Sequence, residues 1–168
     1  MMLWDKFTDR AREAVAQAQE YAYRSQHQQI DVEHLLLALL EPAEGVAASI
    51  FEKLGASREE VMGKLQEELK KLPKIYGSAG EVYASPRMRQ VFELASAEVE
   101  NFKDEFVSVE HLLIAICEEE GLASQLLQEA GITKQSIYKA LMTIRGGQRV
   151  TDPTPEEKYQ ALERYGRD

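Results

Sequence analysis

The sequence predicts an all-α fold of eight helices, arranged as two related four-helix halves. Internal repetition is the first observation, because the pentapeptide VEHLL occurs at 32–36 and again at 109–113. The second is that each half carries its own series of helix start and stop signals. The third is that no stretch alternates apolar and polar residues strongly enough to predict a sheet strand.

The repetition extends well beyond this pentapeptide. A shift of 77 residues places Arg87 on Arg10, and after the loss of one residue the match resumes with Gly121 on Gly45. A match sustained over about 60 residues with one gap is not a chance event, and two copies are too few for a solenoid. The sequence therefore predicts a pseudo-twofold globule.

Four helices are expected in the first copy, each with an apolar face at helical spacing. They run from the N-cap Thr8 to about residue 24, over 32–40 after the cap Asp31, over about 46–54, and over about 58–71 after the cap Ser57. Gly55 is expected to end the third helix in a left-handed conformation. Ser57 and Glu60 match a capping box.

The second copy repeats these signals. Ser85 with Pro86 starts its first helix, Ser108 caps the second, Gly131 ends the third and Thr133 starts the fourth. We assign 1–148 to one domain, made of repeats 1–75 and 82–148 with a loop at 73–80 between them. The remainder, 149–168, is expected to be a linker toward a domain outside this chain, with a short helix to about Arg164.

Charge and cysteine content restrict the partners and the compartment. The chain has 29 acidic and 20 basic residues, a net charge of −9, which disfavours nucleic acid and anionic membrane surfaces as partners. Cys117 is the single cysteine, so an intrachain disulfide is impossible and a reducing compartment is favoured. No apolar run approaches the roughly 18–20 residues of a membrane span. We expect a cytoplasmic protein.

No catalytic or cofactor motif is visible in the sequence. A phosphate-binding loop, a zinc-spaced cysteine pair and a nucleophile elbow are all missing, so neither enzymatic activity nor a bound metal or cofactor is expected in this chain. His34 and His111 are equivalent repeat positions and are expected to be structural, hydrogen-bonding between helices. The charge of −9 also favours a monomer.

Glu33 and Glu110, the repeated glutamates of VEHLL, have two interpretations. A glutamate in the first turn commonly stabilises the helix dipole, by roughly 0.3–1 kcal/mol. Alternatively, each carboxylate works with an N-cap hydroxyl, Thr8 or Ser85, at a helix N-terminus. The helix N-terminus would bind an anion and the carboxylate a guanidinium, which suits a zwitterionic ligand.

The paired F-T-x-R-A-R and V-E-H-L-L segments, the twofold repeat and the glycine-ended third helices resemble the N-terminal domain of Clp-family AAA+ unfoldases. The resemblance covers essentially all of 1–148. The tail from LMTIRGGQRV onward is similar to the segment that joins this domain to the first ATPase ring in ClpB-type disaggregases. The opening MMLWDKFTDRARE and the string EGVAA are more similar to ClpC-type members.

The resemblance implies a mobile module that captures unfolded or aggregated polypeptide for a hexameric, ATP-driven pore working with a DnaK-type chaperone system. ATP and Mg²⁺ are then expected only in ATPase domains outside this chain. In ClpB-type members the implied site is a shallow, partly apolar groove, with Thr8, Leu94, Asp104 and Glu110 at the matching positions here. The ClpC-type alternative is a domain that binds adaptors and phosphoarginine, the latter at Thr8, Glu33, Ser85 and Glu110.

Overall fold

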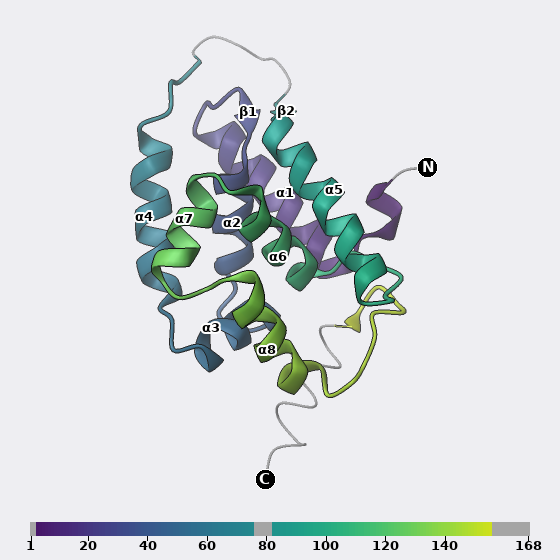
Figure 1. Ribbon diagram of the computed structural model, residues 1–168. Coiled ribbons are helices and arrows are strands. Elements are labelled where there is room, and N and C mark those ends of the chain that lie inside the picture. Colours follow the sequence, from purple (N-terminus) through teal and green to yellow (C-terminus); the bar gives the residue numbers. More distant parts are fainter. Residues whose placement is uncertain (1–2, 76–81, 156–168) are drawn as a thin grey trace.

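A computed structural model of the chain describes residues 3–75 and 82–155 and contains eight α-helices in this part (Figure 1). They are α1 Asp9–Arg24, α2 Val32–Leu40, α3 Val46–Lys53, α4 Arg58–Lys70, α5 Pro86–Asn101, α6 Val109–Glu119, α7 Leu122–Glu129 and α8 Lys134–Arg145. A 3-10 helix, Leu3–Lys6, precedes α1 and has no counterpart among the predicted elements. The all-α prediction and its two four-helix halves are confirmed.

Local capping chemistry explains why the helices begin where they do. The hydroxyl oxygens of Thr8 and Ser85 accept hydrogen bonds from the backbone three residues later, as predicted for N-caps. At α2 and α6 a histidine occupies the third helical position: Nδ1 of His34 and of His111 accepts the backbone N–H of the cap residue. These contacts satisfy N–H groups that the helix itself leaves unpaired.

The two VEHLL helices form the centre of the core. Every residue of α2 is buried, as are eight of the eleven residues of α6. In Figure 1, α2 and α6 lie in the middle, with α4 on one side and α5 on the other. Because α2 contacts both its own repeat (α1, α3, α4) and the other one (α5, α6, α7), no face of it is left for solvent.

Two short strands were missed by the sequence analysis. β1, Gln29–Ile30, pairs in parallel with β2, Tyr83–Ala84. The prediction that no strand is present is therefore wrong for these segments. Alternation cannot reveal a strand of two residues, because one apolar and one polar position make no pattern.

Backbone hydrogen bonds next to these strands connect the two repeats, and they occur as a pair related by the pseudo-twofold axis. Ser85 N–H donates to Ile30 O at 3.0 Å, and the repeat-related bond runs from Thr8 N–H to Val107 O at 2.9 Å. Phe7 and Val107 form an isolated parallel bridge at the second of these positions. The entry to the first helix of each repeat is therefore bonded to the other repeat.

The described part of the predicted linker lies against the helices. Val150 is fully buried, and its carbonyl accepts the N–H of Glu105 at 2.7 Å. Asp9, at the start of α1, donates its N–H to Pro153 O at 2.9 Å. The short helix predicted up to Arg164 lies outside the described residues.

Candidate binding sites at the seam between the repeats

One partly buried group of charges, which we call the Arg87 cluster (Asp31, Glu33, Arg87, Glu119), joins the repeats. Arg87 Nη1 and Nη2 lie 3.1 and 2.9 Å from the two carboxylate oxygens of Glu33. Its Nε and Nη2 each lie 2.9 Å from an oxygen of Glu119. Arg87 therefore binds two carboxylates bidentately, and those carboxylates are 8% and 6% exposed.

Neighbouring residues hold this cluster in place. Ser85, the N-cap of α5, donates its hydroxyl to Asp31 Oδ1 at 2.8 Å, and Ala123 N–H donates to Glu33 Oε2 at 3.2 Å. A methyl group added at Gly121 would overlap Arg87 Nη2, so only glycine permits this approach. The hydrogen bonds from Arg87 to Glu119, and next those to Glu33, outweigh burial and raise the pKa of Arg87.

A second group, the Arg145 cluster (Asp104, Glu110, His111, Arg145), lies within repeat two. Arg145 Nη2 lies 2.9 Å from both Asp104 Oδ2 and Glu110 Oε2. His111 Nε2 lies 2.7 Å from Asp104 Oδ2. All four residues are buried, and Glu110 Oε1 has no hydrogen-bond partner within 3–75 and 82–155.

The Arg145 cluster ties four segments together. Val150 N–H donates to Asp104 Oδ1 at 2.8 Å, and the Arg145 guanidinium carbon lies 4.5 Å from the ring centre of Phe102. Burial opposes ionisation of Asp104. The hydrogen bonds from His111, Arg145 and Val150 outweigh it, so the pKa of Asp104 is lowered.

The predicted histidine role is confirmed. His34 Nε2 lies 2.9 Å from His27 Nδ1, and at the repeat-related position His111 Nε2 bonds to Asp104. Each imidazole therefore links the start of its helix to the segment that follows the preceding helix. The part of the chain that the structure describes has no group of three metal-ligating side chains, and none of its helices is long and apolar enough to cross a membrane.

The structure places the predicted hydroxyls and carboxylates across the seam. Ser85 of repeat two bonds to Asp31, two residues before Glu33. Thr8 of repeat one bonds to Val107, three residues before Glu110. Each hydroxyl therefore lies near the glutamate of the other repeat, Ser85 near Glu33 and Thr8 near Glu110.

Both glutamates are already bound to arginines of this chain. Arg87 binds Glu33 and Arg145 binds Glu110, so the guanidinium that a ligand would offer is supplied internally. Neither arginine was predicted to be a site residue. The match of Arg87 with Arg10 was a usable signal, whereas Arg145 is 35 residues from Glu110 and had none.

The four residues of the implied groove are not equally accessible. Leu94, on α5, is half-buried and packs against the core with free surface remaining. Thr8, Asp104 and Glu110 are 0%, 9% and 0% exposed and are engaged in the contacts described above. Leu94 is the one of the four that a large ligand can touch without rearrangement.

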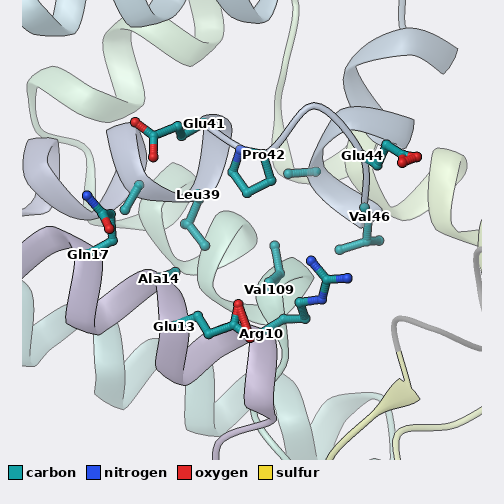
Figure 2. A pocket seen from close by; sticks show the side chains of 13 residues that line it. Arg10, Glu13, Ala14, Gln17, Leu39, Glu41, Pro42, Glu44, Val46 and Val109 are labelled. Atoms are coloured by element: carbon teal, nitrogen blue, oxygen red, sulfur yellow. The ribbon is translucent and has the colours of Figure 1, made fainter.

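A hollow of about 180 Å³ lies mainly on repeat one, bounded by α1, the end of α2, the start of α3 and, from repeat two, Val109 at the start of α6 (Figure 2). Apolar side chains form much of its lining, among them Ala14, Leu39, Pro42, Val46 and Val109. Its charged lining residues are Arg10, Glu13, Glu41 and Glu44. None of these residues was predicted to be a site residue, because the hollow depends on the packing of four helices, α1, α2, α3 and α6.

Residues 6–130 match the family described as Clp repeat (R) N-terminal domain. The chain is 41% identical over 167 residues to chaperone protein ClpB of Bacillus cereus and 38% identical over 164 residues to chaperone protein ClpB 1 of Thermosynechococcus vestitus. These alignments cover 98% of the chain and 19% of each relative, so the chain spans about a fifth of their length.

Solved structures share the fold. The Hsp104 N-terminal domain from Candida albicans superposes with a TM-score of 0.79 at 22% identity, covering 90% of this chain and 99% of that one. A complex of the ClpV N-domain with a VipB peptide superposes with a TM-score of 0.67 at 15% identity, covering 83% and 87%. The chain belongs to the Clp repeat (R) N-terminal domain family, and the curated proteins it resembles along nearly its whole length are ClpB chaperones.

Proposed function

We propose that this chain is the substrate-recognition domain of a ClpB-type protein disaggregase, and that it captures unfolded or aggregated polypeptide at the surface around Leu94. Its alignment with ClpB chaperones over 98% of the chain supports the type of machine. The solved ClpV N-domain with its VipB peptide supports peptide capture as something this fold can do.

The observation that carries the proposed site is that Leu94 is accessible to a ligand, whereas Thr8, Asp104 and Glu110 are buried. Arg87 binds Glu33 across the seam, and Arg145 binds Asp104 and Glu110 within repeat two. These carboxylates are therefore already paired with a cation of this chain and are not offered to a ligand. On α5 the half-buried apolar side chain of Leu94 remains available. Phe92 and Val99 are also half-buried but lie on the opposite flank of the helix, Phe92 about 160° around its axis from Leu94. Reversible recognition of many sequences suits such apolar surface of a few hundred Å².

Binding is expected to be weak. Dissociation constants of roughly 10–1000 μM correspond to about 4–7 kcal/mol, which a shallow surface can supply. Titration with a casein-like unfolded chain should shift amide NMR signals around Leu94. Leu94→Gln should weaken this binding, whereas Met142→Gln, at an exposed apolar residue of α8, should not. Shifts confined to 150–168 would contradict the proposal.

The phosphoarginine alternative loses support from the bound arginines. A ligand guanidinium would have to displace Arg87 from Glu33 or Arg145 from Glu110. Calorimetry with free phosphoarginine should therefore give no saturable heat at millimolar concentration. Binding of two equivalents, each removed by Glu33→Gln or Glu110→Gln, would instead favour the ClpC-type function.

Other properties of the whole machine follow from the same proposal. ATP and Mg²⁺ would bind only domains outside this chain, and hexamer formation would reside there. A DnaK-type partner and a cytoplasmic location complete the proposal. The chain alone should sediment as a monomer and should not bind ATP in calorimetry; a concentration-independent oligomer or micromolar ATP binding would contradict it.

A further inference from the structure

We propose that the hollow on repeat one binds the side chain of an unmodified arginine in an extended polypeptide. This inference rests on the proposed capture of polypeptide and names one chemical group that the domain recognises. The occupant is indicated by the molecule itself, because the repeat-related position on the other half is filled by a guanidinium.

The hollow and the Arg87 cluster occupy equivalent places in the two repeats. Arg10 corresponds to Arg87 and Gly45 to Gly121. In repeat two the guanidinium lies against the glycine, so that an added methyl group would overlap it. In repeat one, apart from Gly45 and its two chain neighbours, no heavy atom lies within 4 Å of the corresponding point on Gly45. The space that a guanidinium fills in one half is therefore open in the other.

The chain's own Arg10 does not close this space, for a reason visible in the sequence. Pro42 stands where repeat two has Glu119, one of the two carboxylates that bind Arg87. Glu110, the counterpart of Glu33, is bound by Arg145 instead. Arg10 consequently forms no ion pair with any residue of 3–75 or 82–155, and Figure 2 shows it at the other end of the hollow from Glu41.

The lining suits the two parts of an arginine side chain. Its apolar residues can pack against the methylene stem. Carboxylates stand around the rim, with Glu41 and Glu44 at opposite ends and Glu13 beside Arg10 (Figure 2), and Glu41 also accepts a hydrogen bond from the Tyr21 hydroxyl. The lining carries three carboxylates and one guanidinium, that of Arg10, so it has an excess of negative charge and favours a cationic ligand. At about 180 Å³ the hollow is smaller than the roughly 300–1,000 Å³ of a drug-sized site and fits a single side chain.

The first experiment compares two ten-residue unstructured peptides that differ only in a central arginine or citrulline. Citrulline has nearly the same shape but no charge. The arginine peptide should shift the amide NMR signals of Gly45, Val46 and Ala47, and the citrulline peptide should bind at least about fivefold more weakly. A phosphoarginine peptide should also bind more weakly, because its phosphoryl group brings negative charge to an acidic rim.

Variants of this chain supply the second test. Glu13→Gln and Glu44→Gln should each weaken the arginine peptide by about threefold. Glu100→Gln removes a carboxylate of α5 that is also exposed but lies outside the hollow, and it should leave binding of the arginine peptide unchanged. Pro42→Glu gives repeat one the carboxylate that binds Arg87 in repeat two. Arg10 should then fold into the hollow, and peptide binding should fall with the thermal midpoint unchanged or raised.

The outcomes separate this inference from the proposed function. Equal affinity for the arginine and citrulline peptides, or shifts at Leu94 alone, would overturn the arginine site. Casein binding that persists and depends on Leu94 would then leave the broader proposal standing. If casein fails to bind while the arginine peptide still shifts Gly45, the capture surface around Leu94 is wrong and the arginine site holds.

Discussion

Arg87 of the second repeat binds Glu33 of the first through two parallel hydrogen bonds, of 3.1 and 2.9 Å. The partners are 54 residues apart in sequence. Because Glu33 is the second residue of α2, this contact fixes the central helix of one repeat to the first helix of the other. A cross-seam ion pair with buried carboxylates should matter more to stability than an exposed pair does.

Arg87→Met should lower the free energy of unfolding by roughly 1–3 kcal/mol, since it leaves Glu33 and Glu119 without their cation. Arg10→Met is the matched control, because Arg10 is also an arginine and occupies the position of repeat one that corresponds to Arg87. Because Arg10 has no ion pair with the described residues, its replacement should change stability by less than about 0.5 kcal/mol. Urea denaturation measures both, and equal losses would refute the assigned role of Arg87.

Arg145→Met should be more damaging, by roughly 3–5 kcal/mol, because the carboxylate side chains of Asp104 and Glu110 are 0% exposed and would remain charged without their cation. Arg145→Lys keeps one positive charge but cannot reach both carboxylates in the same fork geometry. It should therefore fall between wild type and the methionine variant. Thermal unfolding followed by circular dichroism gives the order, and a lysine variant as stable as wild type would show that charge alone suffices.

The buried His27–His34 contact predicts acid sensitivity. His34 accepts Asp31 N–H through Nδ1, so its proton is on Nε2 and is donated to His27 Nδ1. Burial, with the nearby His27 as second cause, lowers the pKa of His34 to about 4. Burial, with Lys74 as second cause, also lowers the pKa of His27.

Since the folded pKa of His34 lies below the unfolded value of 6.5, the unfolded chain binds more protons between pH 6.5 and about 4. The free energy of unfolding should therefore be at its full value above pH 6.5. It should decline as the pH falls toward 4, by on the order of 2 kcal/mol. Urea midpoints at pH 7, 5.5 and 4.5 test this, and His34→Gln should flatten the decline. The lowered pKa of Asp104 acts below 3.8, outside this window, because that carboxylate stabilises the fold only while ionised. An unchanged slope in the glutamine variant would contradict the assignment.

Gly121→Ala should destabilise by about 1–3 kcal/mol, because the new methyl group would displace the Arg87 guanidinium and approach Glu119 Oε1 to 2.6 Å. The backbone at Gly121 has φ −94°, so the effect would come from this overlap and not from strain. Gly63→Ala, in α4 with open space around it, should raise stability by about 0.4–1 kcal/mol. Chemical denaturation of the two variants should thus move in opposite directions.

Helix positions could be predicted because their signals are local. Thr8 and Ser85 bond three residues along the chain, and Gly55 and Gly131 adopt φ of +69° and +85° where the sequence placed helix ends. The repeat itself predicted the pseudo-twofold architecture.

The binding features depend on distant contacts, which no local pattern encodes. Glu33 and Glu110 could be singled out as repeated glutamates, but the arginines that bind them lie 54 and 35 residues away. The repeat match with Arg10 was the one signal for Arg87, and Arg145 had none. The hollow depends on a loop that is one residue longer in repeat one and carries Pro42 where repeat two has Glu119. Such a difference shows in an alignment of the repeats, but its effect on open space requires the packed structure.

The crossed bonds from Thr8 to Val107 and from Ser85 to Ile30 have an evolutionary consequence. Each half completes the other through the same surface, which is the contact pattern of two identical chains related by a twofold axis. A gene duplication that fused two such subunits would produce this chain. Once fused, the two halves could diverge independently. The cleft of repeat two could then keep its own Arg87 side chain, while the corresponding hollow of repeat one became free to bind a ligand.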